Sequence, residues 1–180
     1  MSGFQVTIND LMKKATVFHG HLCPGIAIGV LAAKYALEHG FERSLDEEIV
    51  AVVETDNCSV DALQILLGTT FGKGNLVHLD YGKSNYSFYN RKTQKGVRLA
   101  LKQEISVYKN LSRDEKIQKL LELEPEGVFD IREIEFDPPG LAPINESVPC
   151  SICDEFTMDS RMMNYQGKFM CIPCYKEFKK

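Results

Sequence analysis

Two imidazoles and a thiol lie within five residues of one another near the start of this chain. They are His19, His21 and Cys23, in the segment Phe-His-Gly-His-Leu-Cys-Pro-Gly at residues 18–25. Imidazole and thiolate are good ligands for zinc and other thiophilic metals. Because the chain has only four His and six Cys in 180 residues, this concentration predicts a metal-binding or catalytic site. Side chains that only cap and pack are the alternative.

Two predicted helices flank this segment. Pro24 favours the first position of a helix, and the mostly apolar residues 25–38 predict a buried one. Cys23 therefore lies at a helix N-terminus, where the helix dipole and unpaired N–H groups stabilise a thiolate. A preceding helix, ending near Gly20, is predicted from apolar residues at helical spacing: Ile8, Leu11, Met12 and Ala15.

Cys58 has the same kind of position as Cys23. It follows residues 49–55, a β-branched run that predicts a buried strand, and it opens a helix that Gly68 should end. The two thiols converge if the two helix starts are neighbours. We therefore predict one catalytic or metal-binding core site, formed by His19, His21, Cys23 and Cys58. For Cys58 alone, the alternative is a cysteine that only packs in the core.

The other four cysteines form two C-x2-C pairs near the C-terminus. Cys150 and Cys153 are separated from Cys171 and Cys174 by 17 residues, a spacing typical of tetrahedral zinc sites. Four thiolates close the metal's coordination shell, so we expect structural zinc, with rubredoxin-like iron as the alternative. About 30 residues bury too little apolar surface to fold without the metal.

The fold class predicted from the remaining pattern is α+β. Runs at 76–79, 86–91 and 97–101 indicate antiparallel strands, followed by a helix around Ile117 and a last strand at 131–136. Four prolines predict a stiff linker. The expected domains are a mixed helix and antiparallel-sheet core at 1–136, a Pro-rich linker at 137–149 and a four-cysteine, treble-clef zinc finger at 150–180.

Composition limits the classes of partner. The formal net charge is −4 and the chain has no basic stripe, which makes nucleic-acid binding unlikely and leaves protein contact as the role of the finger. The first residues lack the pattern of a signal peptide, and no apolar run reaches membrane-spanning length. We therefore expect a cytoplasmic protein without membrane contact, whose cysteines stay reduced.

A glycine-rich turn offers a second kind of binding site. Gly72-Lys73-Gly74-Asn75 could hold an anion through its backbone N–H groups, with charge from Lys73 and Lys83 and a contact from Asn75. It is not a Walker loop, because Gly74 stands where Ser or Thr is required. A plain turn is the alternative.

Four motifs in order give the chain a resemblance to a known family. They are residues 18–25, Asp56-Asn57-Cys58-Ser59-Val60-Asp61-Ala62, Gly68-Thr69-Thr70-Phe71-Gly72-Lys73-Gly74-Asn75-Leu76, and Asp80-Tyr81-Gly82-Lys83. The chain resembles the FmdE-like family, which is named for one subunit of formylmethanofuran dehydrogenase, over about residues 10–135. The tail looks like the treble-clef zinc finger of some members, with the four C-terminal cysteines as its zinc ligands.

The resemblance implies an α+β core in an intertwined homodimer, with an active or metal site built from the His/Cys motif. It also implies a link to molybdenum or tungsten formylmethanofuran dehydrogenase, and so to methanogenesis and one-carbon metabolism. Fold transfers between relatives better than function. A non-enzymatic metal carrier or docking accessory, and a zinc-finger regulator, are therefore the alternatives to an enzyme, and a second metal in the core site is expected without its identity.

Overall fold

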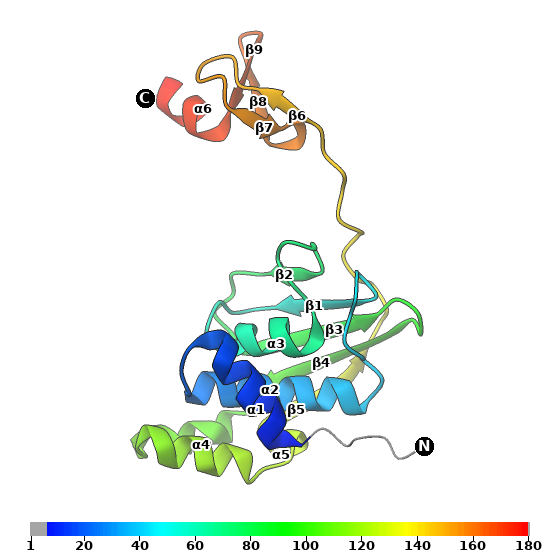
Figure 1. Ribbon diagram of the computed structural model, residues 1–180, viewed down its shortest axis with the longest axis vertical. Helices are drawn as coiled ribbons and strands as arrows, with labels where there is room; N and C mark the ends of the chain where they lie inside the picture. The colour runs from blue at the N-terminus through cyan, green and yellow to red at the C-terminus, as the bar shows by residue number, and fades with distance from the viewer. Residues whose placement is uncertain (1–6, 180) are drawn as a thin grey trace. The chain divides into compact units, whose positions relative to one another are not determined.

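The chain divides into two units in the computed structural model, which describes residues 7–179 apart from the side chains of residues 107 and 109. The first unit extends to Leu141 and contains a five-stranded sheet with its helices; the second begins at Ala142 (Figure 1). The domains predicted from the sequence reach residues 1 and 180, which lie outside the described residues.

The first unit is a mixed α+β domain, as predicted. Its sheet has the strand order β2-β1-β3-β4-β5, in which every pair is antiparallel except β1 with β2. The elements along the chain are α1 Ile8–His19, α2 Pro24–Glu38, β1 Ile49–Val53, α3 Ser59–Leu67, β2 Leu76–His78, β3 Asn85–Asn90, β4 Lys95–Leu101, the 3-10 helix η1 Gln103–Asn110, α4 Arg113–Leu121, α5 Pro125–Val128 and β5 Phe129–Ile134.

Strand β2 differs from the sequence expectation. The pattern at 76–79 predicts an antiparallel strand, but β2 pairs in parallel with β1, with Val52 opposite Val77. The reason is the connection, because α3 lies between the two strands and returns the chain to the same end of the sheet. The β1-to-α3 loop therefore opens at the carboxyl end of β1, the edge at which open sheets commonly bind ligands.

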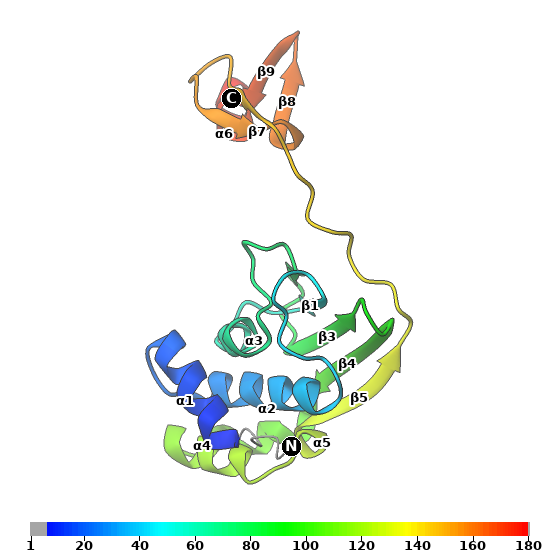
Figure 2. The same cartoon turned by 45° about the vertical axis from the view of Figure 1, so that its right-hand side comes forward.

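The helices cover one face of the sheet (Figure 2). The sheet contributes alternate residues to that face, such as Ala51 opposite Phe88 and Tyr86 opposite Leu99. Helix α2 lies at the centre and is buried on nearly every side, which explains its apolar sequence. Its fully buried side chains are Ile26, Ala27, Val30, Leu31, Ala32, Ala33 and Ala36.

Local signals set the ends of the helices that carry the core cluster. Thr7 forms a capping box with Asp10 at the start of α1, and Gly20 ends α1 with a φ of 89°, in the left-handed region that favours glycine. Gly68 ends α3 in the same way, with a φ of 67°. No helix within residues 7–179 is both long and apolar enough to cross a membrane.

The second unit consists of two short hairpins and a helix. Strand β6 (Ser147–Pro149) pairs with β7 (Phe156–Met158), and β8 (Met162–Tyr165) pairs with β9 (Lys168–Cys171), with the 3-10 helix η2 (Asp159–Arg161) between them and α6 (Ile172–Phe178) at the end. This is the predicted treble-clef arrangement. Its buried residues are few: Cys150, Met170 and Cys171.

Candidate metal centres

The first cluster lies where α1 ends and α2 begins. His19 is the last residue of α1, and the left-handed Gly20 turns the chain so that His21 follows at once. Cys23 is the N-cap of α2, and its sulfur accepts a hydrogen bond from the N–H of Ile26 at 3.4 Å. The thiol is thus held at the positive end of the most deeply buried helix.

The structure brings His19, His21 and Cys23 together. One ligand atom from each lies within 4.8 Å of the other two, and His19 Nε2 is 3.9 Å from Cys23 Sγ. The two imidazole rings have their centroids 4.4 Å apart. Three such atoms fit a tetrahedral ion with one position left for another ligand, which is the pattern of catalytic zinc sites.

Cys58 adjoins this cluster without belonging to the compact group of three. Two glycines of α2 allow the start of α3 to come close, because a Cβ on Gly25 would lie 2.9 Å from Cys58 Cβ and one on Gly29 would lie 2.2 Å from the Ser59 oxygen. Burial raises the pKa of the Cys58 thiol, and the neighbouring Cys23 raises it further. The two helix starts are therefore neighbours.

Asp61 is the residue of this site that sequence reasoning alone misses. Its Oδ2 lies 2.7 Å from His19 Nδ1, and its Oδ1 accepts a hydrogen bond from Gln64 Nε2 at 3.2 Å. The signal that could have found it is the spacing Cys58-x2-Asp61, which places a carboxylate in the first turn of α3 beside the thiol.

A cavity of about 410 Å³ borders the cluster. It opens at the carboxyl end of β1 and is lined by His19, Cys58 and Asp61 together with Asp56 and His78. In the sequence pattern, His78 is only one residue of a predicted strand. Because β2 runs parallel to β1, His78 lies at the carboxyl end of β2, where it lines this cavity. Small molecules therefore have space beside His19 and Cys58.

A chain of hydrogen bonds that begins at a buried tyrosine braces the loop that carries Cys58. The hydroxyl of the fully buried Tyr86 donates to Ser59 Oγ at 2.6 Å, and Ser59 Oγ donates to Asn57 Oδ1 at 2.6 Å. Asn57 Nδ2 in turn donates to Ser84 Oγ at 3.1 Å. Burial raises the pKa of Tyr86 to about 12, so the phenol stays protonated and remains a donor. The position of Cys58 is thus tied to β3.

The second cluster is the four-cysteine group of residues 142–179. All four sulfurs lie within 4.8 Å of one another, and those of Cys153 and Cys171 are 3.9 Å apart. Sulfurs about 2.3 Å from one zinc ion in a tetrahedron are about 3.8 Å apart, so the group fits a closed four-thiolate shell. Backbone N–H groups of Cys153 and Cys171 lower the pKa of Cys150 to about 6, which favours its thiolate form.

Comparison with known proteins decides the family. The family described as "FmdE, Molybdenum formylmethanofuran dehydrogenase operon" matches residues 18–133, a span that contains the whole first cluster, Cys58 and Asp61. This chain belongs to the FmdE family. The four-cysteine unit lies outside the matched span.

Two relatives of this FmdE-family chain cover almost all of it. A crystal structure of a tungsten formylmethanofuran dehydrogenase FmdE-like protein from Syntrophus aciditrophicus matches with a TM-score of 0.73 and 25% identity, over 96% of this chain and 94% of that one. A probable S-adenosyl-L-methionine-binding protein from Archaeoglobus fulgidus is 32% identical over 94% of this chain. The chain spans only 54% of the length of that second relative.

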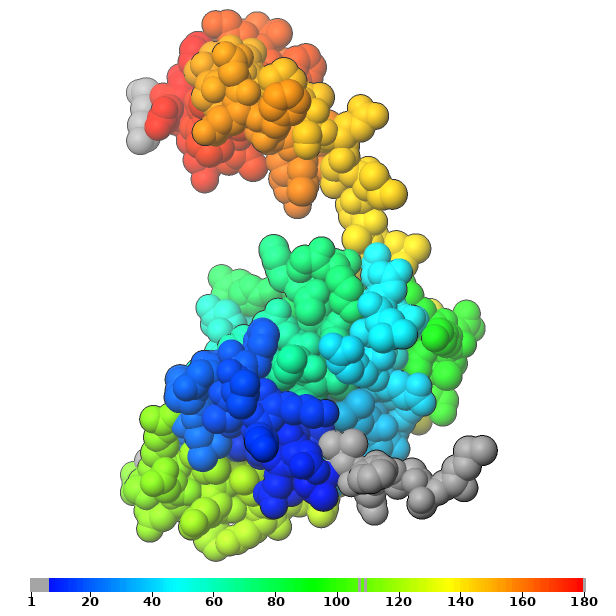
Figure 3. Space-filling view, viewed as in Figure 1, coloured from blue at the N-terminus to red at the C-terminus, as the bar shows by residue number. Residues whose placement is uncertain are grey.

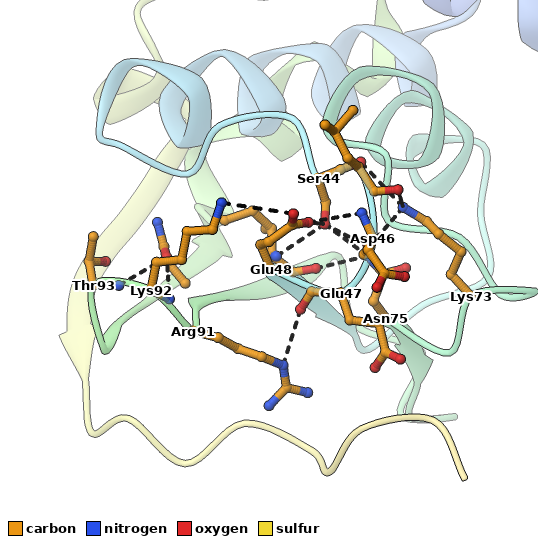
Figure 4. A network of polar contacts seen from close by, with 12 residues as sticks. Ser44, Asp46, Glu47, Glu48, Lys73, Asn75, Arg91, Lys92 and Thr93 are labelled. Carbon is orange, nitrogen blue, oxygen red and sulfur yellow. Dashed lines mark hydrogen bonds and ion pairs between the residues drawn. The ribbon is translucent and has the colours of Figure 1, made fainter. Parts of the chain in front are cut away.

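The glycine-rich motif of this FmdE-family chain forms hydrogen bonds with a neighbouring loop. Figure 4 shows Lys73 and Asn75 directed at residues 44–48. Lys73 Nζ donates to the carbonyl of Asp46 at 2.9 Å, and the buried Asn75 donates to that of Ile49 at 2.9 Å. Asn75 Oδ1 accepts from the N–H of Thr70 at 2.9 Å. These bonds give both residues a structural role, and the predicted anion binding stays a prediction.

Lys83, the third residue predicted to contact an anion, lies apart from this network. Its side chain is exposed, and its N–H donates to the carbonyl of Glu54 at 2.8 Å. Neither Lys73 nor Lys83 lines the cavity beside the first cluster. The structure thus brings together His19, His21 and Cys23, with Cys58 adjoining them, but it does not bring the predicted anion-binding residues to the same place.

Proposed function

We propose that this FmdE-family chain binds a thiophilic metal at His19, His21 and Cys23, with Cys58 as an adjoining thiol, and structural zinc at its four C-terminal cysteines. The observation that carries the proposal is the group of three ligand atoms within 4.8 Å, beside a cavity of about 410 Å³. A metal with an open position polarises a carbonyl or activates water. The residues around it orient the ligands and shape the space for a substrate.

Metal analysis of the purified chain tests the core site. We expect two metal ions per chain in the wild type and a single one in Cys23→Ser, with weaker core binding in Cys58→Ser. His39→Ala is the matched control, because His39 bonds to the carbonyl of Tyr35 at the far end of α2 and should keep both ions. Unchanged metal content and affinity in both cysteine variants would contradict the core site.

We further propose that the chain acts with a molybdenum or tungsten formylmethanofuran dehydrogenase in one-carbon metabolism. Support comes from the family's description and from the name of the Syntrophus protein. Co-purification of a molybdenum- or tungsten-containing enzyme with the tagged chain is the expected result. Transfer of the core metal to a competing acceptor, without turnover, would instead favour a carrier or accessory.

A homodimer is part of the same proposal. Support comes from an apolar groove of about 880 Å³ between α1 and α3, where Val17 is 76% exposed and Phe18 is 52% exposed. Helix α1 and the residues around 40–48 lie on the face seen in Figure 3. Light scattering should give twice the chain mass, and Val17→Glu should reduce it to one chain mass; a monomeric wild type would contradict the dimer.

The Archaeoglobus relative suggests a second candidate function, binding of S-adenosyl-L-methionine. The cavity beside Cys58 favours it, because its lining residues include Asp56, Asp61 and Phe71 but neither Lys nor Arg. Carboxylates and an aromatic ring suit a sulfonium cation. Calorimetry should show binding of S-adenosyl-L-methionine and weaker binding of S-adenosylhomocysteine, which has a neutral thioether in place of the sulfonium group. Equal affinities, or no binding, would contradict this candidate.

A further inference from the structure

Asp61 and His19 form a short side-chain contact between two helices. His19 Nδ1 lies 2.7 Å from Asp61 Oδ2, although the residues are 42 positions apart in the sequence. Only 12% of the His19 side chain and 36% of the Asp61 side chain are exposed. A carboxylate can only accept a hydrogen bond, so this contact requires the proton on Nδ1.

The carboxylate is itself held in place. Gln64 donates to its other oxygen at 3.2 Å from the same helix, three residues further on. Asp61 lies in the first turn of α3, where the helix dipole stabilises a negative charge. Helix α3 is fixed in turn by the close approach of Ser59 to Gly29. The carboxylate that faces His19 is thus held by a second hydrogen bond and by the packing of its helix.

The opposite nitrogen of His19 faces the first cluster. With the proton on Nδ1, the neutral ring has its lone pair on Nε2, and Nε2 is the atom that lies 3.9 Å from Cys23 Sγ. His21 differs, because no described residue of 7–179 forms a hydrogen bond with its ring. Of the two imidazoles, only that of His19 is therefore oriented by a hydrogen bond to another described residue.

We propose that Asp61 is a positioning residue that holds His19 in the Nδ1–H tautomer and so makes Nε2 its metal-binding atom. The tautomer follows from the geometry of the protein alone, whereas the effect on metal rests on the function proposed above. Carboxylates in this position raise the basicity of a histidine ligand, and losing one typically weakens metal binding about 10- to 100-fold.

The test uses the full chain labelled with nitrogen-15. Two-bond proton–nitrogen spectra of the metal-free protein at about pH 8, where a free imidazole is neutral, identify the tautomer of each histidine. We expect the Nδ1–H form for His19 in the wild type and a shift toward the Nε2–H form in Asp61→Ala. Zinc titration of the core site should show about 10- to 100-fold weaker binding in Asp61→Ala.

Two further variants make the result specific. Asp61→Asn keeps the size of the side chain and one acceptor oxygen. Unlike Asp61→Ala, it should therefore keep the Nδ1–H form of His19 and part of the metal affinity. Asp56→Ala removes another carboxylate that lines the cavity, and it should match the wild type in the tautomer of His19 and in the zinc affinity of the core site. An Nε2–H tautomer in the wild type, or an Asp61→Ala variant with unchanged tautomer, would overturn the proposal. An Nδ1–H tautomer without core metal binding would support the positioning and refute the proposed function.

Discussion

The chain gathers candidate metal ligands in two places, and the two clusters lie in units with very different apolar cores. The His19, His21 and Cys23 cluster lies on two helix ends of a large domain, against buried residues such as Ile26 and Ala27. The four-cysteine cluster lies in a unit whose only buried members among the described residues are Cys150, Met170 and Cys171. Two of these three are themselves members of the four-cysteine cluster.

On the proposed function, this difference gives a metal two different roles. In the second unit the apolar core is too small to offset the entropy of ordering the chain, so a bound metal would supply folding free energy. In the first unit a large apolar core can position the candidate ligands by itself. A three-membered cluster beside a cavity suits chemistry, whereas a closed group of four thiols suits structure.

The largest effect is expected from breaking the second cluster. Cys171→Ser removes a buried thiol of the four-cysteine group, so residues 142–179 should lose their folded state while the first unit keeps its own. Proton–nitrogen correlation spectra should show the signals of 142–179 collapsing to unfolded positions. In Cys23→Ser, the matched change in the first cluster, both units should stay folded. Unfolding of the first unit by that change would show that its fold, too, depends on its cluster.

The next largest effect concerns the packing that brings the helix starts together. A Cβ on Gly29 would lie 2.2 Å from the backbone oxygen of Ser59, so Gly29→Ala must displace α3 and with it Cys58 and Asp61. We expect destabilisation of the first unit by about 3 kcal/mol, measured by urea unfolding. Gly127→Ala is the control, because its Cβ would meet Leu123 at an ordinary 3.6 Å and should leave stability nearly unchanged. Equal effects of the two variants would show that the helix contact does not hold the site.

A smaller effect should appear in the pH dependence of the first unit. Hydrogen bonds from the backbone N–H groups of Asp46 and Glu48 and from Ser44 Oγ lower the pKa of Glu48 from 4.5 to about 2. Because the pKa is lower in the folded state, this stabilisation is fully present above about pH 4.5 and is lost as the pH falls toward 2. Glu48→Gln should therefore flatten the pH dependence of unfolding in that window. Parallel curves for the variant and the wild type would contradict this role.

Local features of the molecule could be predicted from the sequence, because their causes are local. The proline at the start of α2 and the glycine at the end of α3 each act within a few residues, and these helices begin and end accordingly. Spacing alone also identifies the four-cysteine group and the first cluster, because their members are close in sequence or paired in C-x2-C motifs.

What could not be predicted depends on contacts between distant segments. The parallel orientation of β2 follows from the path of the chain around α3, and the partner of His19 lies 42 residues away. The carbonyl group of Asp46 that binds Lys73 is 27 residues from it, so the sequence pattern of the turn does not reveal how its lysine is engaged. Periodicity and spacing carry no information about such pairs.

Zinc titration of the metal-free full chain, followed by proton–nitrogen spectra, tests most directly whether the two clusters use metal differently. We expect the first unit to be folded before zinc is added and its signals to shift only near residues 19–25 and 56–61. Signals of folded residues 142–179 should appear only with zinc. Unfolding of the first unit without metal, or saturation at one zinc ion per chain with no shift near His19, would show that the two clusters do not use metal in these different ways.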